Sequence, residues 1–206
     1  MNNDREILIV GNGEDLCSKG TIKNFENIVA ADGGYNNIPK SVKPLCVIGD
    51  FDSINEKDLP ERIEKIKFSQ RKDFTDIELA IVYSIRKGYK NIFITGISGS
   101  RKDHFFTSLM LLKKYEKYNI HLLTSKEEIF ILKPLTIYKF LNMKDKRVSF
   151  FSITPKSEKI VSKGFEYEYK NRTLYFDSPI GVSNRIIKDK VLFTFKKGKI
   201  LCFLEI

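Results

Sequence analysis

The sequence has only three cysteines among its 206 residues, Cys17, Cys46 and Cys202. Their odd number, their wide spacing and their places in or near apolar segments exclude a disulfide framework and a cysteine-based zinc site. We therefore expect three buried free thiols. The chain has only two histidines, so a histidine-rich metal site is excluded as well, and His121, inside an apolar strand, is expected to be structural.

Long apolar segments are also absent. No run approaches the roughly 20 residues that cross a bilayer. The first ten residues, MNNDREILIV, lack the basic segment and long apolar region of a secretory signal. We expect a cytoplasmic protein with no membrane partner.

Two common nucleotide-binding motifs are missing. No GxxxxGK[ST] segment occurs, which excludes a P-loop. The GNG at residues 11–13 begins like a dinucleotide fingerprint, but Leu16 occupies the position of its third glycine. NAD binding is therefore not favoured.

Positive charge is in excess, with a formal net charge of +10. Residues 1–125 carry 19 basic and 17 acidic side chains, whereas residues 126–206 carry 17 and 9. These charges are scattered singly and form no long basic run, so we interpret them as a solvated surface and expect no nucleic-acid partner. Attraction of an anionic ligand is the alternative interpretation.

Residues 1–125 alternate short apolar strands with helical patterns, which predicts a mostly parallel, Rossmann-like sheet with helices on both faces. The clearest helix begins at Thr75, which can form a capping box with Glu78, and Gly88 can end it. A second helix is expected from about Asp103 to Lys117. The strands are predicted at residues 6–10, 27–32, 44–50, 65–68, 91–96 and 120–124.

Residues 126–206 have a different residue pattern, in which short aromatic and β-branched segments are separated by Gly, Pro, Asn and Lys. Such spacing predicts an antiparallel β-sandwich or barrel-like domain. We place the domain boundary near residues 124–128. The seven predicted strand segments are EEIFILK, LTIYKF, RVSFFSIT, FEYEYK, TLYFDS, VLFTFKKG and KILCFLEI.

Acidic side chains follow four successive strands of the first domain. Ligands of parallel sheets bind outside the carboxyl ends of the strands, so these loops are the candidate site. If the DFD segment is extended, Asp50 and Asp52 point the same way, toward one Mg²⁺ ion, while Phe51 packs behind them. A cation would also offset the repulsion among the carboxylates. The acidic residues of these loops are Asp32, Asp50, Asp52, Asp73, Asp76 and Asp103.

Purely structural roles remain open for these residues. Asp, Gly and Ser commonly end strands and form turns. Asp76 can be a charge at a helix start and Asp103 an N-cap. Arg101 can bind phosphate or be solvated.

The ordered segments ADGGYN, GDFDS, KDFTDIELA, GSRKDH and GVSN together resemble the thiamine pyrophosphokinase family over nearly the whole chain. The resemblance implies transfer of pyrophosphate from ATP to the hydroxyl of thiamine, with release of AMP and a requirement for Mg²⁺. It also implies a homodimer, with thiamine between the nucleotide- and metal-binding domain 1–125 of one subunit and the thiamine-binding domain 126–206 of the other.

The resemblance assigns roles to particular residues. Asp50, Asp52 and Asp76 would bind the metal, and Asp32 and Asp103 would complete the catalytic site, with Asp103 orienting or deprotonating the thiamine hydroxyl. Two positions depart from the family pattern: Ser100 replaces the second glycine of Gly-Gly-Arg, and Ser108 replaces an asparagine. The candidates for phosphate contacts are Lys72, Thr75 and Arg101, and those for thiamine contacts are Ser183, Asn184 and Tyr167.

Two other functions are compatible with parts of the sequence. A metal-dependent nucleotide-sugar transferase would use the DFD carboxylates, but this leaves KDFTD and the β domain unexplained. A basic β domain with aromatic side chains could instead bind oligonucleotides. Tyr167, assigned to thiamine above, can equally be a core or surface tyrosine.

Overall fold

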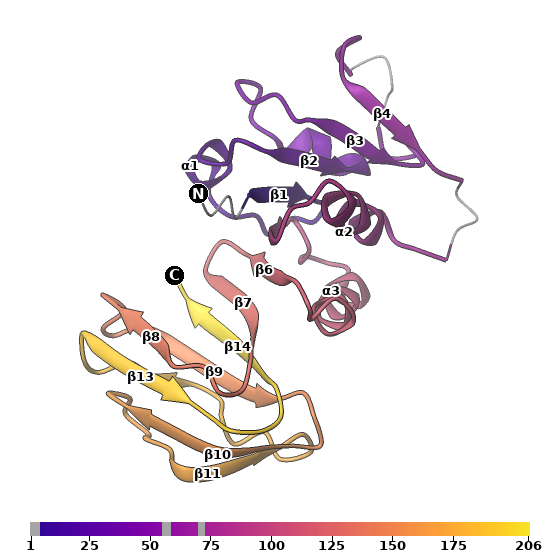
Figure 1. Ribbon diagram of the computed structural model, residues 1–206. Coiled ribbons are helices and arrows are strands. Elements are labelled where there is room, and N and C mark those ends of the chain that lie inside the picture. The colour runs from indigo at the N-terminus through magenta and orange to yellow at the C-terminus, as the bar shows by residue number, and fades with distance from the viewer. Residues whose placement is uncertain (1–4, 55–58, 70–72) are drawn as a thin grey trace. The chain divides into compact units, whose positions relative to one another are not determined.

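The computed structural model describes residues 5–54, 59–69 and 73–206 (Figure 1). The chain forms two compact units, residues 1–125 and 126–206. The first contains a parallel sheet with helices, and the second contains antiparallel strands. The predicted mixed α/β fold with a second, antiparallel part is therefore confirmed.

Six strands of the first unit form a parallel sheet in the order β6-β5-β1-β2-β3-β4. The central strands β1 and β2 are apolar and, apart from Glu6, buried, as expected for a parallel sheet. The bounds are β1 Glu6–Val10, β2 Ile28–Ala31, β3 Cys46–Gly49, β4 Glu64–Lys67, β5 Asn91–Thr95 and β6 Asn119–Leu123.

The helices of this unit follow the predicted caps only in part. Thr75 caps α2, and Lys87 ends it directly before Gly88, which has a φ of 85°. The second predicted helix begins one residue earlier than expected, at Lys102, and ends three residues earlier. The bounds are α1 Lys19–Lys23, the 3₁₀ helix η1 Asp32–Asn37, α2 Asp76–Arg86 and α3 Lys102–Lys114.

The strand predicted at residues 65–68 is not buried. It corresponds to β4, which pairs with β3 at the edge of the sheet that the structure describes and leaves three of its four residues exposed. An edge position explains its lysines and glutamate, because charged side chains discourage further strand pairing.

The strand order reverses direction at β1, which lies between β2 and β5. The connections that leave the adjacent strands β1 and β5 run in opposite directions along the sheet, and ligands of α/β sheets bind at such a position, outside the carboxyl ends of the strands. The loops that follow β1 and β5 therefore mark the expected position of a site in this unit.

The second unit contains two antiparallel sheets, with strand orders β12-β9-β14-β7 and β11-β10-β13-β8 (Figure 1). Both contribute to one buried cluster, in which Phe150 and Phe193 stack with ring centroids 4.2 Å apart. The bounds are β7 Glu127–Leu132, β8 Tyr138–Leu141, β9 Arg147–Ser152, β10 Lys156–Lys163, β11 Lys170–Tyr175, β12 Asn184–Arg185, β13 Lys190–Thr194 and β14 Ile200–Glu205.

One strand prediction in this unit is wrong. The segment FEYEYK is mostly irregular chain that leads into β11, whereas β10 was not predicted. The reason is that β10 buries only Ser157, Ile160 and Ser162, with register shifts that interrupt a regular alternation, so its apolar signal is weak.

Cys17, Cys46 and Cys202 are buried free thiols, as predicted. Burial raises the pKa of the Cys46 thiol to about 11, which keeps it protonated at neutral pH. His121 lies in β6 with its ring 5.2 Å from that of Phe93, in line with a structural role. Among the described residues, no helix is long and apolar enough to span a membrane.

Candidate active site

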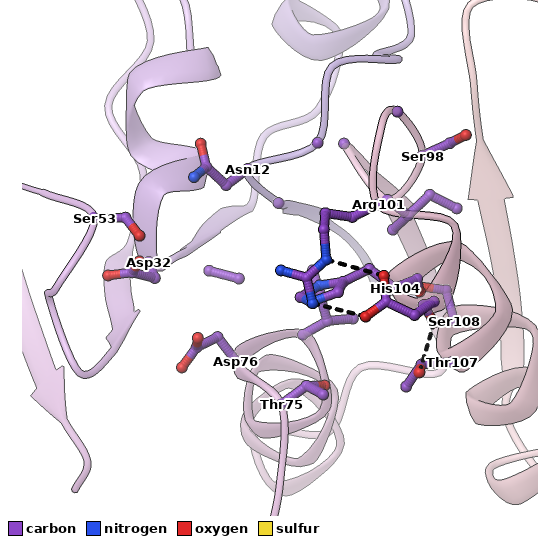
Figure 2. Close-up of a pocket in the computed structure, with 18 of the residues that line it drawn as sticks. Asn12, Asp32, Ser53, Thr75, Asp76, Ser98, Arg101, His104, Thr107 and Ser108 are labelled. Carbon is purple, nitrogen blue, oxygen red and sulfur yellow. Dashed lines mark hydrogen bonds and ion pairs between the residues drawn. The ribbon is translucent and has the colours of Figure 1, made fainter. Parts of the chain in front are cut away.

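A pocket of about 580 Å³ lies at the carboxyl ends of the strands in the first unit (Figure 2). Its lining comes from the loops that follow β1, β2, β3 and β5, from the start of α2 with the two residues before it, and from the first two turns of α3. Its size suits a small-molecule ligand. The lining segments are residues 11–14, 31–32, 50, 52–53, 74–77, 96–101, 103–104 and 107–108.

The loops after β1 and β5 lie against each other. The Gly13 N–H donates to the Gly96 carbonyl at 2.7 Å, and the Asp15 N–H donates to the Ser98 carbonyl at 3.0 Å. A Cβ on Gly13 would lie 2.6 Å from the Gly96 oxygen, so this approach requires glycine. Asn12 and Glu14 thus line the pocket and were not predicted, although the GNG after a strand was the available signal.

Three carboxylates gather on one side of the pocket. One oxygen each of Asp32, Asp50 and Asp52 lies within 4.8 Å of the others. Asp32 begins η1 directly after β2, and Asp50 and Asp52 follow β3, so neighbouring strands bring the three together. Such closely spaced negative charges repel one another unless a cation lies between them.

The DFD backbone is not extended, contrary to the expectation. Phe51 has a φ of 64°, and the Asp52 N–H donates to Asp50 Oδ1 at 3.3 Å. The two carboxylates therefore approach through a tight turn and not through strand alternation. Phe51 is nevertheless buried in the core of the first unit, as predicted.

Asp32 is the deepest of the three carboxylates. It is only 6% exposed, and its Oδ1 has no hydrogen-bond partner in the described part of the chain. An unpaired buried carboxylate oxygen is costly, and a bound cation would satisfy it. Carboxylate oxygens are also the ligands that Mg²⁺ prefers, so these residues fit a magnesium ion.

Asp76 does not belong to this group of three but lines the same pocket. It is the first residue of α2, where the helix dipole favours a negative charge. Figure 2 shows Asp76 and Asp32 on the same side of the pocket in this view, with Arg101 across from them. The predicted capping box is half formed: Thr75 Oγ1 accepts from the Glu78 N–H, but the Glu78 carboxylate bonds Tyr115 and Lys114.

Arg101 and Asp103 pair at the opposite side. The Arg101 Nε and Nη2 groups donate to the two oxygens of Asp103 at 3.0 and 2.7 Å. These hydrogen bonds lower the pKa of the Asp103 carboxyl well below its usual range. Asp103 is the second residue of α3 and not its N-cap, so the N-cap interpretation is wrong.

The two departures from the family pattern have defined partners. Ser100 Oγ donates to Glu14 Oε1 at 2.7 Å, which links the loops after β5 and β1. Ser108 is buried, and its hydroxyl donates to the His104 carbonyl at 3.0 Å. Lys72, a predicted phosphate contact, lies outside the described residues.

The predicted thiamine contacts lie in the second unit. Asn184 is 2% exposed, and its side chain bonds the peptide groups of Tyr167: Oδ1 accepts at 3.0 Å and Nδ2 donates at 2.8 Å. Tyr167 is exposed and lines, with Asn184, a second pocket of about 210 Å³. Ser183 has a φ of 56° and lies in the chain between Val182 and Asn184, which both line this pocket, but Ser183 itself is not among the lining residues.

Comparison with known proteins agrees with this arrangement. The family description "Thiamin pyrophosphokinase, catalytic domain" matches residues 19–124, and "Thiamin pyrophosphokinase, vitamin B1 binding domain" matches residues 135–200. The thiamine pyrophosphokinase of Bacillus subtilis is 33% identical over 173 residues, which cover 81% of this chain and 80% of that protein.

Solved structures of the same family share the fold. The crystal structure of the Bacillus subtilis thiamine pyrophosphokinase has a TM-score of 0.86 at 25% identity, over 97% of this chain and 98% of that one. The Geobacillus thermodenitrificans structure has a TM-score of 0.86 at 24% identity, over 98% and 97%. Neither the nucleotide-sugar transferase nor the nucleic-acid-binding alternative is favoured by these similarities. The chain belongs to the thiamine pyrophosphokinase family.

Proposed function

We propose that the protein transfers the pyrophosphoryl group of ATP to the hydroxyl of thiamine, and that the pocket of the first unit is where this takes place. The observation that carries the proposal is the gathering of Asp32, Asp50 and Asp52, with one buried Asp32 oxygen unpaired. A nucleotide polyphosphate with its cation is the ligand that such a pocket suits.

Magnesium is the proposed cofactor. Asp50, Asp52 and Asp76 would bind it, as the family resemblance implies, and the position of Asp32 adds a fourth carboxylate. When bound, the ion neutralises negative charge on the polyphosphate. The carboxylates of the chain thus select a metal complex of ATP over the free nucleotide, which they would repel.

The remaining side chains orient the reactants. In the proposed reaction, the thiamine oxygen forms a bond to the β-phosphorus, the bond from that phosphorus to the bridging oxygen of AMP breaks, and the hydroxyl proton is released. In-line displacement of this kind depends on positioning and on charge stabilisation. Lys72, Thr75 and Arg101 are the proposed phosphate contacts.

Asp103 is proposed to orient the thiamine hydroxyl. Its pairing with Arg101 makes it a weak base, so accepting a hydrogen bond from the hydroxyl suits it better than removing the proton. If Arg101 moves to the phosphates when ATP binds, Asp103 regains basicity.

The thiamine end is proposed to contact Tyr167, Ser183 and Asn184. Tyr167 offers an exposed aromatic ring, and Asn184 fixes the peptide groups of Tyr167.

We further propose a homodimer that binds thiamine between the first unit of one chain and the second unit of the other. Sedimentation at several concentrations tests the dimer.

We also propose the fold type of each unit and the location of the protein in the cell. The first unit is proposed to be Rossmann-like, with helices on both faces of its sheet, and the second to be a β-sandwich. A cytoplasmic location is proposed because three unpaired thiols suit a reducing compartment.

The decisive experiment incubates the purified protein with ATP, Mg²⁺ and thiamine, and measures AMP and thiamine diphosphate together. We expect equal amounts of both, dependent on thiamine and abolished by EDTA. AMP without thiamine diphosphate, or equal product with EDTA present, would contradict the proposal.

A further inference from the structure

Glu78 is a buried acidic residue that does not line the pocket but lies two residues after Asp76 in α2. It is only 6% exposed. Its Oε1 accepts from the Tyr115 hydroxyl at 2.6 Å and lies 2.6 Å from Lys114 Nζ. Tyr115 and Lys114 are at the C-terminal end of α3, so Glu78 joins the start of one site helix to the end of the other.

The contacts around Glu78 form a compact group. The Lys114 ammonium lies 5.3 Å from the ring centroid of Phe74 and 5.7 Å from that of Tyr115. Phe74 directly precedes the N-cap Thr75 and lines the pocket. Lys114 therefore contacts residues on both sides of the α2 start.

The hydrogen bond from Tyr115 persists at neutral pH. Burial, followed by the hydrogen bond to Glu78, raises the pKa of Tyr115 to about 12, so the phenol remains protonated and can donate. A buried carboxylate keeps its place only while such partners satisfy it.

Helix geometry places Glu78 and Asp76 on different sides of α2. Two residues correspond to a rotation of about 200°, so Asp76 can face the pocket while Glu78 faces α3. Thr75 Oγ1 accepts from the Glu78 N–H at 3.2 Å, so Glu78 is bound through its backbone as well. A side chain fixed on the far side of the first turn limits the rotation of that turn.

We propose that Glu78, bound by Tyr115 and Lys114, is a positioning residue that keeps Asp76 and Thr75 directed into the pocket. The inference rests on the proposed function, because the affected ligand is the Mg²⁺ complex of ATP. Glu78 itself touches neither the pocket nor the reacting groups.

The test measures binding without turnover. Calorimetry with Mg²⁺ and α,β-methylene-ATP, in the absence of thiamine, is applied to the wild type, Tyr115→Phe and Lys114→Met. Tyr115→Phe removes one hydrogen bond and keeps the ring. We expect each variant to bind the complex roughly tenfold more weakly. This factor corresponds to the net contribution of one hydrogen bond.

Lys113→Met is the matched control. Lys113 is the neighbouring lysine of α3, but its ammonium pairs at 2.6 Å with Glu116, a residue outside α2. We expect wild-type affinity from this variant. Glu78→Gln, which can still accept from Tyr115, should fall between the wild type and Tyr115→Phe.

Melting temperatures separate positioning from a merely structural role. If Tyr115→Phe melts at a lower temperature but binds the complex as the wild type does, Glu78 only stabilises the fold and the inference is overturned. Asp52→Asn tests the site itself: if it binds the complex normally, the proposed function fails. Weak binding by Asp52→Asn with normal binding by Tyr115→Phe and Lys114→Met overturns the inference alone.

Discussion

Arg101 donates two hydrogen bonds to the carboxylate of Asp103, at 3.0 and 2.7 Å, across one intervening residue. Both side chains are mostly solvent-exposed. The planar guanidinium group of Arg101, next to the start of α3, thus binds both oxygens of the carboxylate. This pairing changes the acidity of Asp103, a proposed catalytic residue.

Arg101→Gln should raise the pKa of Asp103. The guanidinium favours the ionised carboxylate, so its loss lets the pKa return toward the ordinary value of about 3.9. In the wild type, Asp103 should remain ionised as the pH falls through 4, whereas in the variant it should be half protonated there. Carboxyl NMR titration measures this directly. The same titration in Lys102→Gln serves as the control, and equal pKa values in all three proteins would contradict the prediction.

Asp32→Asn should stabilise the metal-free protein and weaken its response to Mg²⁺. Removing one buried negative charge relieves repulsion from Asp50 and Asp52, a gain of about 1 kcal/mol. Wild-type protein should melt at a higher temperature with Mg²⁺ than with EDTA, because the ion binds the folded state. The variant should lose most of this shift. Asp177→Asn, outside the pocket, is the control and should retain it.

Gly13→Ala should separate the loops after β1 and β5. The new methyl group would lie 2.6 Å from the Gly96 carbonyl oxygen, and the crowding should cost about 1 to 3 kcal/mol of stability. The KM for ATP should rise more than the KM for thiamine. Gly20→Ala is the control, since its nearest neighbour would be Ser18 Oγ at 3.5 Å. A normal KM for ATP in folded Gly13→Ala would argue against this loop contacting the nucleotide.

Asn184→Ala should destabilise the second unit by about 2 kcal/mol, since it leaves peptide groups near Tyr167 without partners. Asn184→Asp keeps the acceptor for the Tyr167 and Arg185 N–H groups, but it buries a charge and places a carboxylate oxygen against the Tyr167 carbonyl, so it should cost at least as much. Urea denaturation gives both values. If Asn184→Ala is as stable as the wild type but binds thiamine poorly, Asn184 acts by direct contact and not by shaping the pocket.

Much of the fold could be predicted because it depends on local patterns. Apolar β-branched segments correspond to the buried strands β1, β2, β3 and β5, and the cap at Thr75 correctly indicates the start of α2. The prediction failed where the local signal was weak or ambiguous. The edge strand β4 is exposed, and β10 buries only two serines and one isoleucine.

The sequence alone shows that acidic residues follow successive apolar segments: Asp32 and Asp50 come directly after buried strands, and Asp76 and Asp103 come at the helix starts that follow the next strands. Which carboxylates come together depends on the tertiary structure, since strand order and the turn at Phe51 bring Asp32 to Asp50 and Asp52, and the start of α2 adds Asp76 to the lining of the same pocket. Hydrogen bonds between residues distant in the sequence could not be predicted either. Glu78 meets Tyr115 and Asn184 meets Tyr167 because packing, and not local spacing, selects the partners of buried polar groups.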